Sequence, residues 1–402
     1  MIFRVNRLVM FLILMGALVA SCQVNGSTPT DEPALMATAT LPAPEVVDTE
    51  AVPTAEPTPL DKPALLASLE DGSVLSADNL ADLQFLGQFN LTEEPTAFTF
   101  RAWSPDGSRL ALCYPGETSR VVIYDLEGGD QITTIEIPAD VCPDTNMRIV
   151  DSFTLSRNGD LLLAPMEQGF GIYQTATGEL LSQLDFEFPG FLEQAAFSSQ
   201  GTRLAVDLHH PVAPEGRSTG LPYSAINLFE VETGSSFGLF FQRDDWYITD
   251  LEYSTEGEYL VVASSDGVEA WHVEGGQLPI VDCPDAEITF SPVRDEAALS
   301  CHPMGEDIVW EQMVWDLATG DLTPLSGTSD TQILDLRYSP DGALLAGLSE
   351  SGSVSIWDAA TGEHLLTLDE PFESPVDLAF VHGGRALAVL NEFGFVGFYT
   401  AP

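Results

Sequence analysis

The chain has very little positive charge. Only 14 of its 402 residues are lysine or arginine, against 62 aspartates and glutamates, and the formal net charge is −48. Nucleic-acid binding needs a basic surface that displaces counterions from phosphates, so this composition argues against nucleic acid as a partner. Solubility, or adaptation to a salty or acidic exterior, accounts for the acidity, and a surface that binds cations or a basic partner is the alternative.

The sequence also lacks the motifs of the common catalytic classes. It contains no G-x-S-x-G elbow, P-loop, H-E-x-x-H helix or EF-hand loop. No two of its five cysteines have Cys-x-x-Cys spacing, which argues against zinc. The only adjacent histidines are His209 and His210, whose side chains would point to opposite faces at a strand end. We therefore expect no catalysis, no cofactor and no bound metal.

A secretion signal is present at the N-terminus. Arg4 and Arg7 precede an apolar run, Leu8–Val19, that is too short to span a membrane with ease. The run ends in Val-Ala-Ser-Cys, which resembles the lipobox of bacterial lipoproteins. The resemblance implies that residues 1–21 are a signal peptide and that Cys22 becomes the lipid-modified N-terminus. An ordinary signal peptide followed by a chance cysteine is the alternative.

Residues 22–60 are rich in Thr, Pro, Ala and Glu and contain few large apolar side chains. Such a composition cannot bury enough surface to offset chain entropy, so we expect a disordered linker, and whether it carries O-linked sugar stays open. Together the two segments predict an extracytoplasmic protein that is anchored to the cell membrane by lipid at Cys22.

A repeat occupies the remainder of the chain. A strand-like segment ends seven times in an element related to Ser-Pro-Asp-Gly, a tight-turn sequence. The anchor positions are Ser104, Ser156, Ser198, Ser254, Ser291, Ser339 and Val381. A second apolar strand follows each anchor, and a third strand carries an aromatic residue. The aromatic positions are Tyr124, Tyr173, Phe229, Trp271, Trp315, Trp357 and Tyr399. A repeat of about 42 residues with four strands is typical of a β-propeller.

Trp315-Asp316 and Trp357-Asp358 resemble the dipeptide of WD40-repeat propellers. The Ser-Pro-Asp-Gly elements are similar to the WD40-like, YVTN-type repeats of bacterial periplasmic propellers. Several of the aromatic positions lack the following Asp, and the Gly-His pair of eukaryotic repeats is missing. The resemblance implies an all-β, seven-bladed propeller over residues 61–402. It does not indicate a particular subfamily of these propellers.

The last repeat ends at its third strand, and the apolar segment Leu83–Phe89 precedes the first repeat. We therefore expect this N-terminal strand to complete the last blade and remove a free sheet edge.

All the longer insertions fall on one side of the expected ring. They occur between second and third strands or in the crossovers between blades, and these connections share one rim, which we call the decorated rim. The opposite plain rim would hold only tight turns. Because loops on a rigid scaffold commonly carry function, we predict a partner-binding face on the decorated rim. Its candidate residues are His209, His210, Arg243, Asp244, Asp245, Trp246, Tyr247 and Trp310.

Four cysteines fall on the same rim. Cys113 and Cys301 end second strands, whereas Cys142 and Cys283 lie in crossovers. Three pairings are possible, and local geometry favours Cys113–Cys142 and Cys283–Cys301. Four free thiols are the alternative, although an exported location favours oxidation.

These features predict a monomeric scaffold whose decorated rim binds an unidentified protein or peptide. Two alternatives remain open, because a fold does not decide a function. One is a propeller hydrolase or lyase that acts on a sugar or lactone with a metal or carboxylate pair in the central channel. The other is a surface module that binds carbohydrate or cations.

Lipidation gives the first testable prediction. Globomycin treatment should leave an uncleaved precursor, and Cys22→Ala should release the protein from membranes, because several acyl chains are needed for stable anchoring. Membrane fractionation measures both effects. A Cys22→Ala variant that stays in the membrane fraction would contradict the anchor.

Overall fold

The chain divides into two compact units, Met1–Thr58 and Pro59–Pro402, and every residue that the computed structural model describes belongs to the second. The described residues are 61–91, 98, 100–138, 142, 153–167, 169–184, 191–210, 223–244, 247–302, 311–327, 332–369 and 374–402.

The anchor serine closes each tight turn with its side chain. Ser339 Oγ accepts a hydrogen bond from the backbone N–H of Leu344 (2.9 Å) and donates one to Asp341 (2.6 Å). Gly342 adopts a φ of +69°, which glycine tolerates best, and its N–H bonds to the Ser339 carbonyl. The same side-chain bond to the residue five positions on recurs at Ser104, Ser156, Ser198 and Ser254. The repeated serine is therefore a local turn-forming residue.

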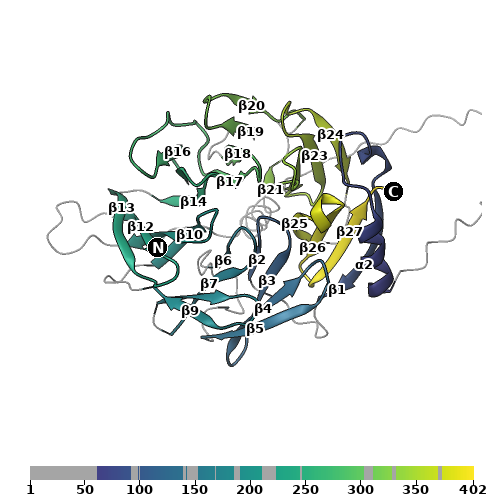
Figure 1. Cartoon of the computed structure of the whole chain (residues 1–402). Coiled ribbons are helices and arrows are strands. Elements are labelled where there is room, and N and C mark those ends of the chain that lie inside the picture. The colour runs from purple at the N-terminus through teal and green to yellow at the C-terminus, as the bar shows by residue number, and fades with distance from the viewer. Residues whose placement is uncertain are drawn as a thin grey trace, which may run out of the picture. The chain divides into compact units, whose positions relative to one another are not determined.

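The strands form seven antiparallel sheets around a ring (Figure 1). Blade 1 contains β2 (Phe100–Trp103), β3 (Arg109–Tyr114), β4 (Ser119–Asp125) and β5 (Gln131–Ile137). Blade 2 contains β6 (Thr154–Leu155), β7 (Leu161–Pro165), β8 (Phe170–Gln174) and β9 (Leu180–Gln183). Blade 3 contains β10 (Phe191–Phe197), β11 (Arg203–His210), β12 (Tyr223–Glu230) and β13 (Ser236–Asp244). Blade 4 contains β14 (Ile248–Tyr253), β15 (Tyr259–Ser264) and β16 (Gly267–His272).

The remaining blades complete the ring. Blade 5 contains β17 (Glu287–Phe290), β18 (Glu296–Cys301), β19 (Glu311–Asp316) and β20 (Leu322–Pro324). Blade 6 contains β21 (Ile333–Tyr338), β22 (Leu344–Ser349), β23 (Val354–Asp358) and β24 (His364–Leu368). Blade 7 contains β25 (Pro375–Val381), β26 (Ala386–Asn391), β27 (Phe395–Thr400) and the N-terminal strand β1 (Gln84–Asn90).

Strand β1 closes the propeller as predicted. It pairs antiparallel with β27, with Gln84 opposite Thr400 and Asn90 opposite Phe395. Because β27 runs from the decorated rim to the plain rim, β1 begins at the plain rim and ends at the decorated rim. The seven-bladed, all-β architecture expected from the repeats is thus confirmed.

The hydrophobic core consists of seven clusters, each lying between two neighbouring blades. The cluster between blades 7 and 1, for example, combines Leu110 and Leu112 with Ala388 and Phe398. Both faces of every blade are therefore buried, which explains why the central strands read as nearly continuous apolar runs.

The Trp-Asp pairs have separate roles in packing and turn formation. Trp357 is fully buried, and its indole N–H donates to the Ser326 carbonyl of the preceding blade (2.9 Å). Asp358 Oδ1 accepts the backbone N–H groups of Ala360 (3.1 Å) and Thr361 (2.9 Å) and so shapes the next turn. Asp316 forms the same bonds in blade 5.

The glycine that ends several of these turns allows one blade to approach the next. A Cβ at Gly362 would lie 2.1 Å from the Pro324 carbonyl oxygen, and one at Gly234 would lie 2.0 Å from that of Gln183. Each contact joins the turn between the third and fourth strands of one blade to the edge strand of the blade before it.

Blade 4 departs from the expected four strands. Residues 277–281 take the place of the fourth strand and are joined to β16 only by isolated bridges at Gln277 and Val281. Pro279 lies between them and cannot donate to a ladder, which accounts for the interruption. A Cβ added at either of the preceding glycines, Gly275 and Gly276, would meet no atom within 4 Å, so these two glycines make no close approach to blade 3.

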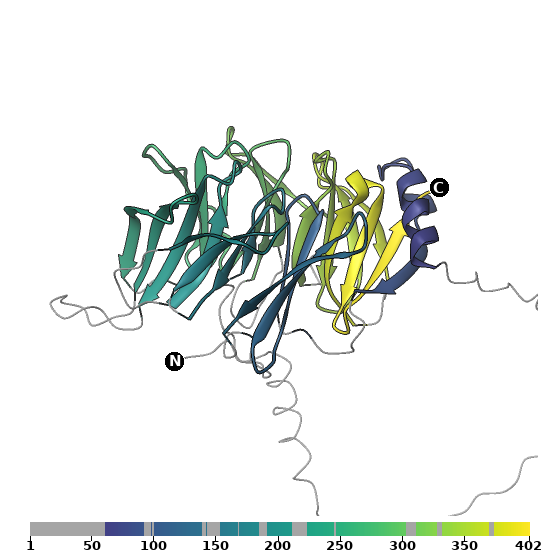
Figure 2. The same cartoon turned by 60° about the horizontal axis from the view of Figure 1, so that its bottom comes forward.

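Helix α2 (Lys62–Asp71) was not predicted, although its signals are present in the sequence. Asp61 caps the helix by accepting the Ala64 N–H (3.0 Å), and a proline lies in the first turn. Leu65 and Leu69 are fully buried in the cluster between blades 7 and 1. Figure 2 shows α2 beside β27.

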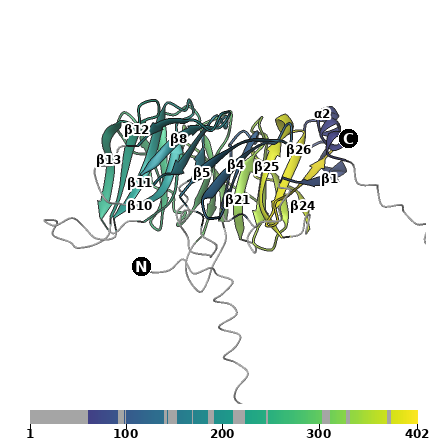
Figure 3. The same ribbon diagram turned by 90° about the horizontal axis from the view of Figure 1, so that it is seen from below.

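The segment after α2 continues along the plain rim. Leu75 donates its N–H to the Gly384 carbonyl (2.8 Å), and Leu80, in the short 3₁₀ helix η1 (Leu80–Asp82), packs between blades 6 and 7. The plain rim therefore carries more than the tight turns we expected. Figure 3 shows α2 beside β1 at the outer edge of blade 7.

The longest connections between strands lie on the decorated rim, as predicted. Residues 138–153 form a crossover, whereas 211–222 and 302–310 join second and third strands. The connections between first and second strands are short in every blade.

The glycine contacts give a matched stability test. Gly362→Ala should destabilise the propeller by about 2–5 kcal/mol, because a left-handed residue costs ~1–2 kcal/mol and overpacking against Pro324 adds ~1–3 kcal/mol. Gly320→Ala is the control, since Gly320 has the same turn and a positive φ but no neighbour within 4 Å. Denaturant unfolding of both variants measures the difference. Equal losses would show that the close approach contributes nothing.

Candidate functional site

The first strands of the blades line the central channel, and four of them contain a β-bulge (Figure 1). The register shifts lie in β10, β14, β21 and β25. A bulge re-aims the side chain that follows it. The residue after each bulge is polar, and the four are Gln194, Asp250, Asp335 and Asp377.

Several of these side chains join one blade to the next. Gln194 donates its amide N–H to the Thr249 carbonyl of blade 4 (2.9 Å). Asp250 accepts the Ile288 N–H of blade 5 (2.7 Å). The channel residues therefore hold neighbouring first strands together as well as supplying charge.

Asp377 forms the strongest of these links. Its carboxylate lies 2.8 Å from Arg101 Nε of blade 1 and 3.6 Å from Arg337 Nη2 of blade 6. Burial alone would raise the pKa of Asp377, but the two guanidinium groups outweigh it, and the pKa lies below its ordinary value. Asp377 is therefore ionised and shared between three blades.

Asp335 behaves in the opposite way. Burial raises its pKa well above the ordinary value, although Arg337 lies 2.5 Å away and acts in the other direction. The neighbouring Asp377 contributes to the rise through its charge and through a hydrogen bond between the two carboxyl groups. Asp335 thus carries the proton of this pair.

Glu252 is a third carboxyl group with an altered pKa. Burial, followed by the charge of Asp250, raises the pKa of Glu252 to about 8, although Arg157 and Arg337 oppose the shift. A carboxyl group that keeps its proton near neutral pH can act as a general acid. The same shift also arises at purely structural sites in buried ion networks.

Arg157 links three blades at the plain-rim end of the channel. It belongs to the blade 2 turn and donates to the Pro292 carbonyl of blade 5 and to Thr255 Oγ1 of blade 4, both at 3.2 Å. Burial lowers the pKa of Arg157, while surrounding carboxylates, Glu252 first among them, act to raise it. The arginine therefore reaches across the channel between blades that are not neighbours.

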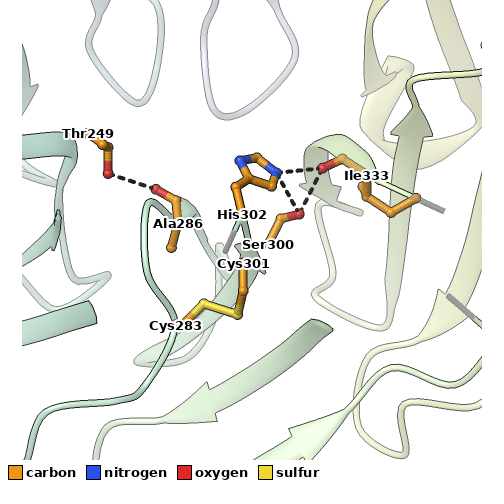
Figure 4. The surroundings of a disulfide bond; sticks show 7 residues. All are labelled: Thr249, Cys283, Ala286, Ser300, Cys301, His302 and Ile333. Atoms are coloured by element: carbon orange, nitrogen blue, oxygen red, sulfur yellow. Dashed lines mark hydrogen bonds between the residues drawn. A yellow bond between two sulfur atoms is a disulfide. The ribbon is translucent and has the colours of Figure 1, made fainter. Parts of the chain in front are cut away.

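Two disulfides strengthen the decorated rim. The structure joins Cys113 to Cys142 and Cys283 to Cys301, the pairing favoured from the sequence. Each ties a second strand to the crossover next to its blade. Figure 4 shows the Cys283–Cys301 bond beside Ser300 and His302.

Ser300 and His302 lie close enough to suggest a catalytic pair, but their hydrogen bonds argue for another role. Both bond to the Ile333 carbonyl oxygen, Ser300 Oγ at 2.8 Å and His302 Nε2 at 3.0 Å (Figure 4). A carbonyl only accepts, so Nε2 carries a proton and cannot take one from the serine. This pair joins blade 5 to blade 6.

The predicted partner-binding residues are only partly described. Arg243, at the end of β13, lies 2.9 Å from Glu269, which is 2% exposed, and 3.9 Å from Asp266. Arg243 therefore forms an ion pair between blades 3 and 4. Tyr247 is exposed in the crossover that follows and donates to Glu193 (3.3 Å).

The other predicted residues of this face fall where less of the chain is described. Asp245, Trp246 and Trp310 lie outside the described residues, as does Cys22. His209 and His210 end β11 and Asp244 ends β13, but the described part of the chain does not include their side-chain surroundings.

Two exposed apolar residues of the decorated rim were missed. Leu334 is the extra residue of the β21 bulge and is 38% exposed, and Phe393, between β26 and β27, is 49% exposed. The sequence gives little signal for either, because both occur in apolar segments that resemble ordinary strands.

Within the described ranges, no group of three or more His, Cys, Asp or Glu side chains is arranged to hold a metal ion. In the same part of the chain, no helix has the length and apolar character needed to cross a membrane.

A family model matches part of the chain. Residues 321–358, from the end of blade 5 through most of blade 6, match the family model described as WD domain, G-beta repeat. This stretch includes the second Trp-Asp pair and the Ser339 turn. No curated protein shows significant similarity to the chain.

Glu252 gives a prediction on pH dependence. Its folded-state pKa of about 8 exceeds its ordinary value, so the folded chain binds more protons than the unfolded chain between about pH 4.5 and 8. The free energy of unfolding should therefore fall as pH rises through this window. Glu252→Gln should flatten that decline and be more stable than the parent at pH 8.5. Denaturant unfolding at several pH values measures it.

Glu274→Gln is the control, because Glu274 is an exposed carboxylate on a blade 4 turn. It should leave the pH slope unchanged. A Glu252→Gln variant with the same slope as the parent would contradict the raised pKa of Glu252.

Proposed function

We propose that this chain is a lipid-anchored, extracytoplasmic propeller that binds a protein or peptide partner on its decorated rim and carries out no catalysis. The fold is that of a WD40-like propeller, which is consistent with a protein-binding scaffold. The observation that carries the proposal is that the long connections, both disulfides and several exposed apolar side chains share one rim.

The exposed side chains are those that suit a partner. Tyr247, Leu334 and Phe393 are 38%, 38% and 49% exposed on the decorated rim. Aromatic and large apolar residues supply most of the binding energy in protein interfaces, and a polar rim excludes water from them. On an acidic chain with a net charge of −48, a partner with a basic surface would associate fastest.

The charged channel favours a structural role over catalysis. Asp377, Arg101 and Arg337 are engaged with one another, and Asp250 bonds to the backbone of the next blade. Removing one member of a buried ion pair costs about 3–5 kcal/mol, so such groups are poorly placed to change partners during a reaction.

The two disulfides support the proposed location. Disulfides persist in oxidising compartments outside the cytoplasm. A lipid at Cys22 and a linker over residues 22–60 would tether the propeller to the membrane. We propose that the protein acts as a monomer.

One observation favours a hydrolase or lyase as the second candidate. Glu252 retains its proton near neutral pH and lies beside Asp250 in the channel. A general acid of this kind would make Glu252→Gln lose turnover of lactone or glycoside substrates. The described residues offer no metal cluster to assist it.

Site-specific photo-crosslinking tests the scaffold. In full-length protein in native membranes, benzoylphenylalanine at Phe393 should yield a discrete protein adduct, because this position faces the proposed partner. The matched control is Val293, which is 50% exposed on the plain rim. A Tyr247→Ser, Leu334→Asn variant should lose the adduct at least tenfold, since each truncation of a central apolar contact costs ~1–2 kcal/mol. Adducts at Val293 alone, or at both positions equally, would contradict the proposal.

A further inference from the structure

A group of hydrogen bonds on the decorated rim connects a disulfide to an exposed residue of the proposed partner-binding face. The Ile333 carbonyl oxygen accepts from Ser300 Oγ (2.8 Å) and from His302 Nε2 (3.0 Å) across the boundary between blades 5 and 6 (Figure 4). The next residue, Leu334, is exposed and is one of the side chains that we assign to partner binding. The two donors flank Cys301, the last residue of β18.

The bonds to this carbonyl constrain the backbone of Leu334. The Ile333 carbonyl and the Leu334 N–H belong to one planar peptide unit, so holding the oxygen from two directions also fixes the orientation of the N–H. Leu334 is the extra residue of the β21 bulge, which lies between Ile333 and Asp335 in the pairing with β22. A bulge residue is left unpaired in its own ladder. The donors from blade 5 therefore supply a constraint on Leu334 that pairing within blade 6 does not give.

The bulges of β14 and β25 are held in a different way. In both, the bonded carbonyl belongs to the extra residue itself. Thr249 accepts from Gln194 Nε2 (2.9 Å), and it is buried. Val376 accepts from the Arg101 guanidinium, and it is partly buried. In β21 the bonded carbonyl lies one residue earlier, and the side chain of the extra residue, Leu334, is exposed.

The Cys283–Cys301 disulfide holds the end of β18 that carries the two donors. Pairing of β18 with β17 ends at Ser300, so Cys301 and His302 extend past that ladder. Two contacts with the crossover replace it: the disulfide to Cys283, and the hydrogen bond from the His302 N–H to the Pro284 carbonyl (3.0 Å). Successive side chains of a strand point to opposite faces, so the disulfide faces blade 4 whereas Ser300 and His302 face blade 6.

This disulfide is enclosed by the fold. Both sulfurs belong to buried residues of the cluster between blades 4 and 5. Thiol–disulfide exchange needs access to a sulfur, so the bond has to form while the rim folds and is then shielded from reductants. In that step the two thiols exchange with the disulfide of a thiol oxidoreductase. Two S–H bonds break, one S–S bond forms, and the oxidoreductase takes up two electrons and two protons as a dithiol.

We propose that the Cys283–Cys301 disulfide, acting through His302, fixes Leu334 in its partner-binding position, so that the decorated rim becomes competent to bind after this bond has formed. The inference deepens the proposed scaffold function and rests on it for the role of Leu334 in binding. Because the cytoplasm keeps thiols reduced, oxidation would follow export and confine binding to the outside of the cytoplasm. His302 is a positioning residue, since it acts on the partner through Leu334.

Hydrogen exchange of the full-length protein, measured without a partner, tests the positioning. A Cys283→Ala, Cys301→Ala variant should exchange the amides of residues 333–336 about tenfold faster than the parent, because this segment loses its constraint. The matched control is a Cys113→Ala, Cys142→Ala variant, which removes the other disulfide of the same rim. Its cysteines are 29 residues apart against 18, so its global destabilisation should be at least as large. Residues 333–336 should nevertheless exchange as in the parent.

Two substitutions at His302 separate the hydrogen bond from the disulfide. His302→Leu should speed exchange of the same segment about fivefold with the disulfide intact, the usual effect of losing one hydrogen bond. His302→Gln supplies an amide N–H at a similar reach and should keep the parent rate. The yield of the adduct from benzoylphenylalanine at Phe393 in native membranes then measures binding. It should fall in His302→Leu and in the Cys283→Ala, Cys301→Ala variant, and it should stay at the parent level in His302→Gln.

Parent-like exchange in the Cys283→Ala, Cys301→Ala variant or in His302→Leu would overturn the positioning. Equal acceleration in both disulfide variants would do the same, because it would reflect a general loosening of the rim. Fast exchange with an unchanged adduct yield would overturn the link to binding. If the parent itself gave no adduct at Phe393 while exchange behaved as expected, the scaffold function would fall and the positioning of Leu334 would stand.

Discussion

Neighbouring blades stabilise one another, and the ring is held together by the packing between them. The hydrophobic core is divided into seven interblade clusters, so no blade can bury both of its faces alone. An open ring would expose two apolar faces and a free strand edge. β1 removes the edge by pairing with β27, and Leu65 and Leu69 of α2 fill the outer part of the same junction. The N-terminal segment is therefore part of the closure of the ring.

The channel and the rims serve different purposes. Charged residues of the first strands form ion pairs between blades, as Asp377 does with Arg101 and Arg337. The exposed apolar residues include Tyr247, Leu334 and Phe393 on the decorated rim. This division favours binding at surfaces over chemistry in the channel.

The candidate sites could be predicted only in part. The decorated rim follows from the lengths of connections, and Tyr247 is exposed there as expected. Arg243 stays a predicted contact residue, and its ion pair with the buried Glu269 gives it a partner on another blade that was not predicted. Spacing along the chain cannot reveal such a partner, because the two residues meet through the packing of blades 3 and 4. The exposure of Leu334 could not be predicted for a similar reason, because it arises from the β-bulge in β21.

The number of blades, the closing strand, the rim that carries the insertions and the preferred cysteine pairs could all be predicted from the order of residues. These features depend on the residues of local turns and on the alternation of apolar and polar residues in strands, and both can be read from the sequence. Two other features emerged from the folded arrangement alone: which carboxyl groups keep their protons, and how blade 4 departs from the repeat. Burial and charge are summed over neighbours in space, and the residues of adjacent blades that create them are far apart in the chain.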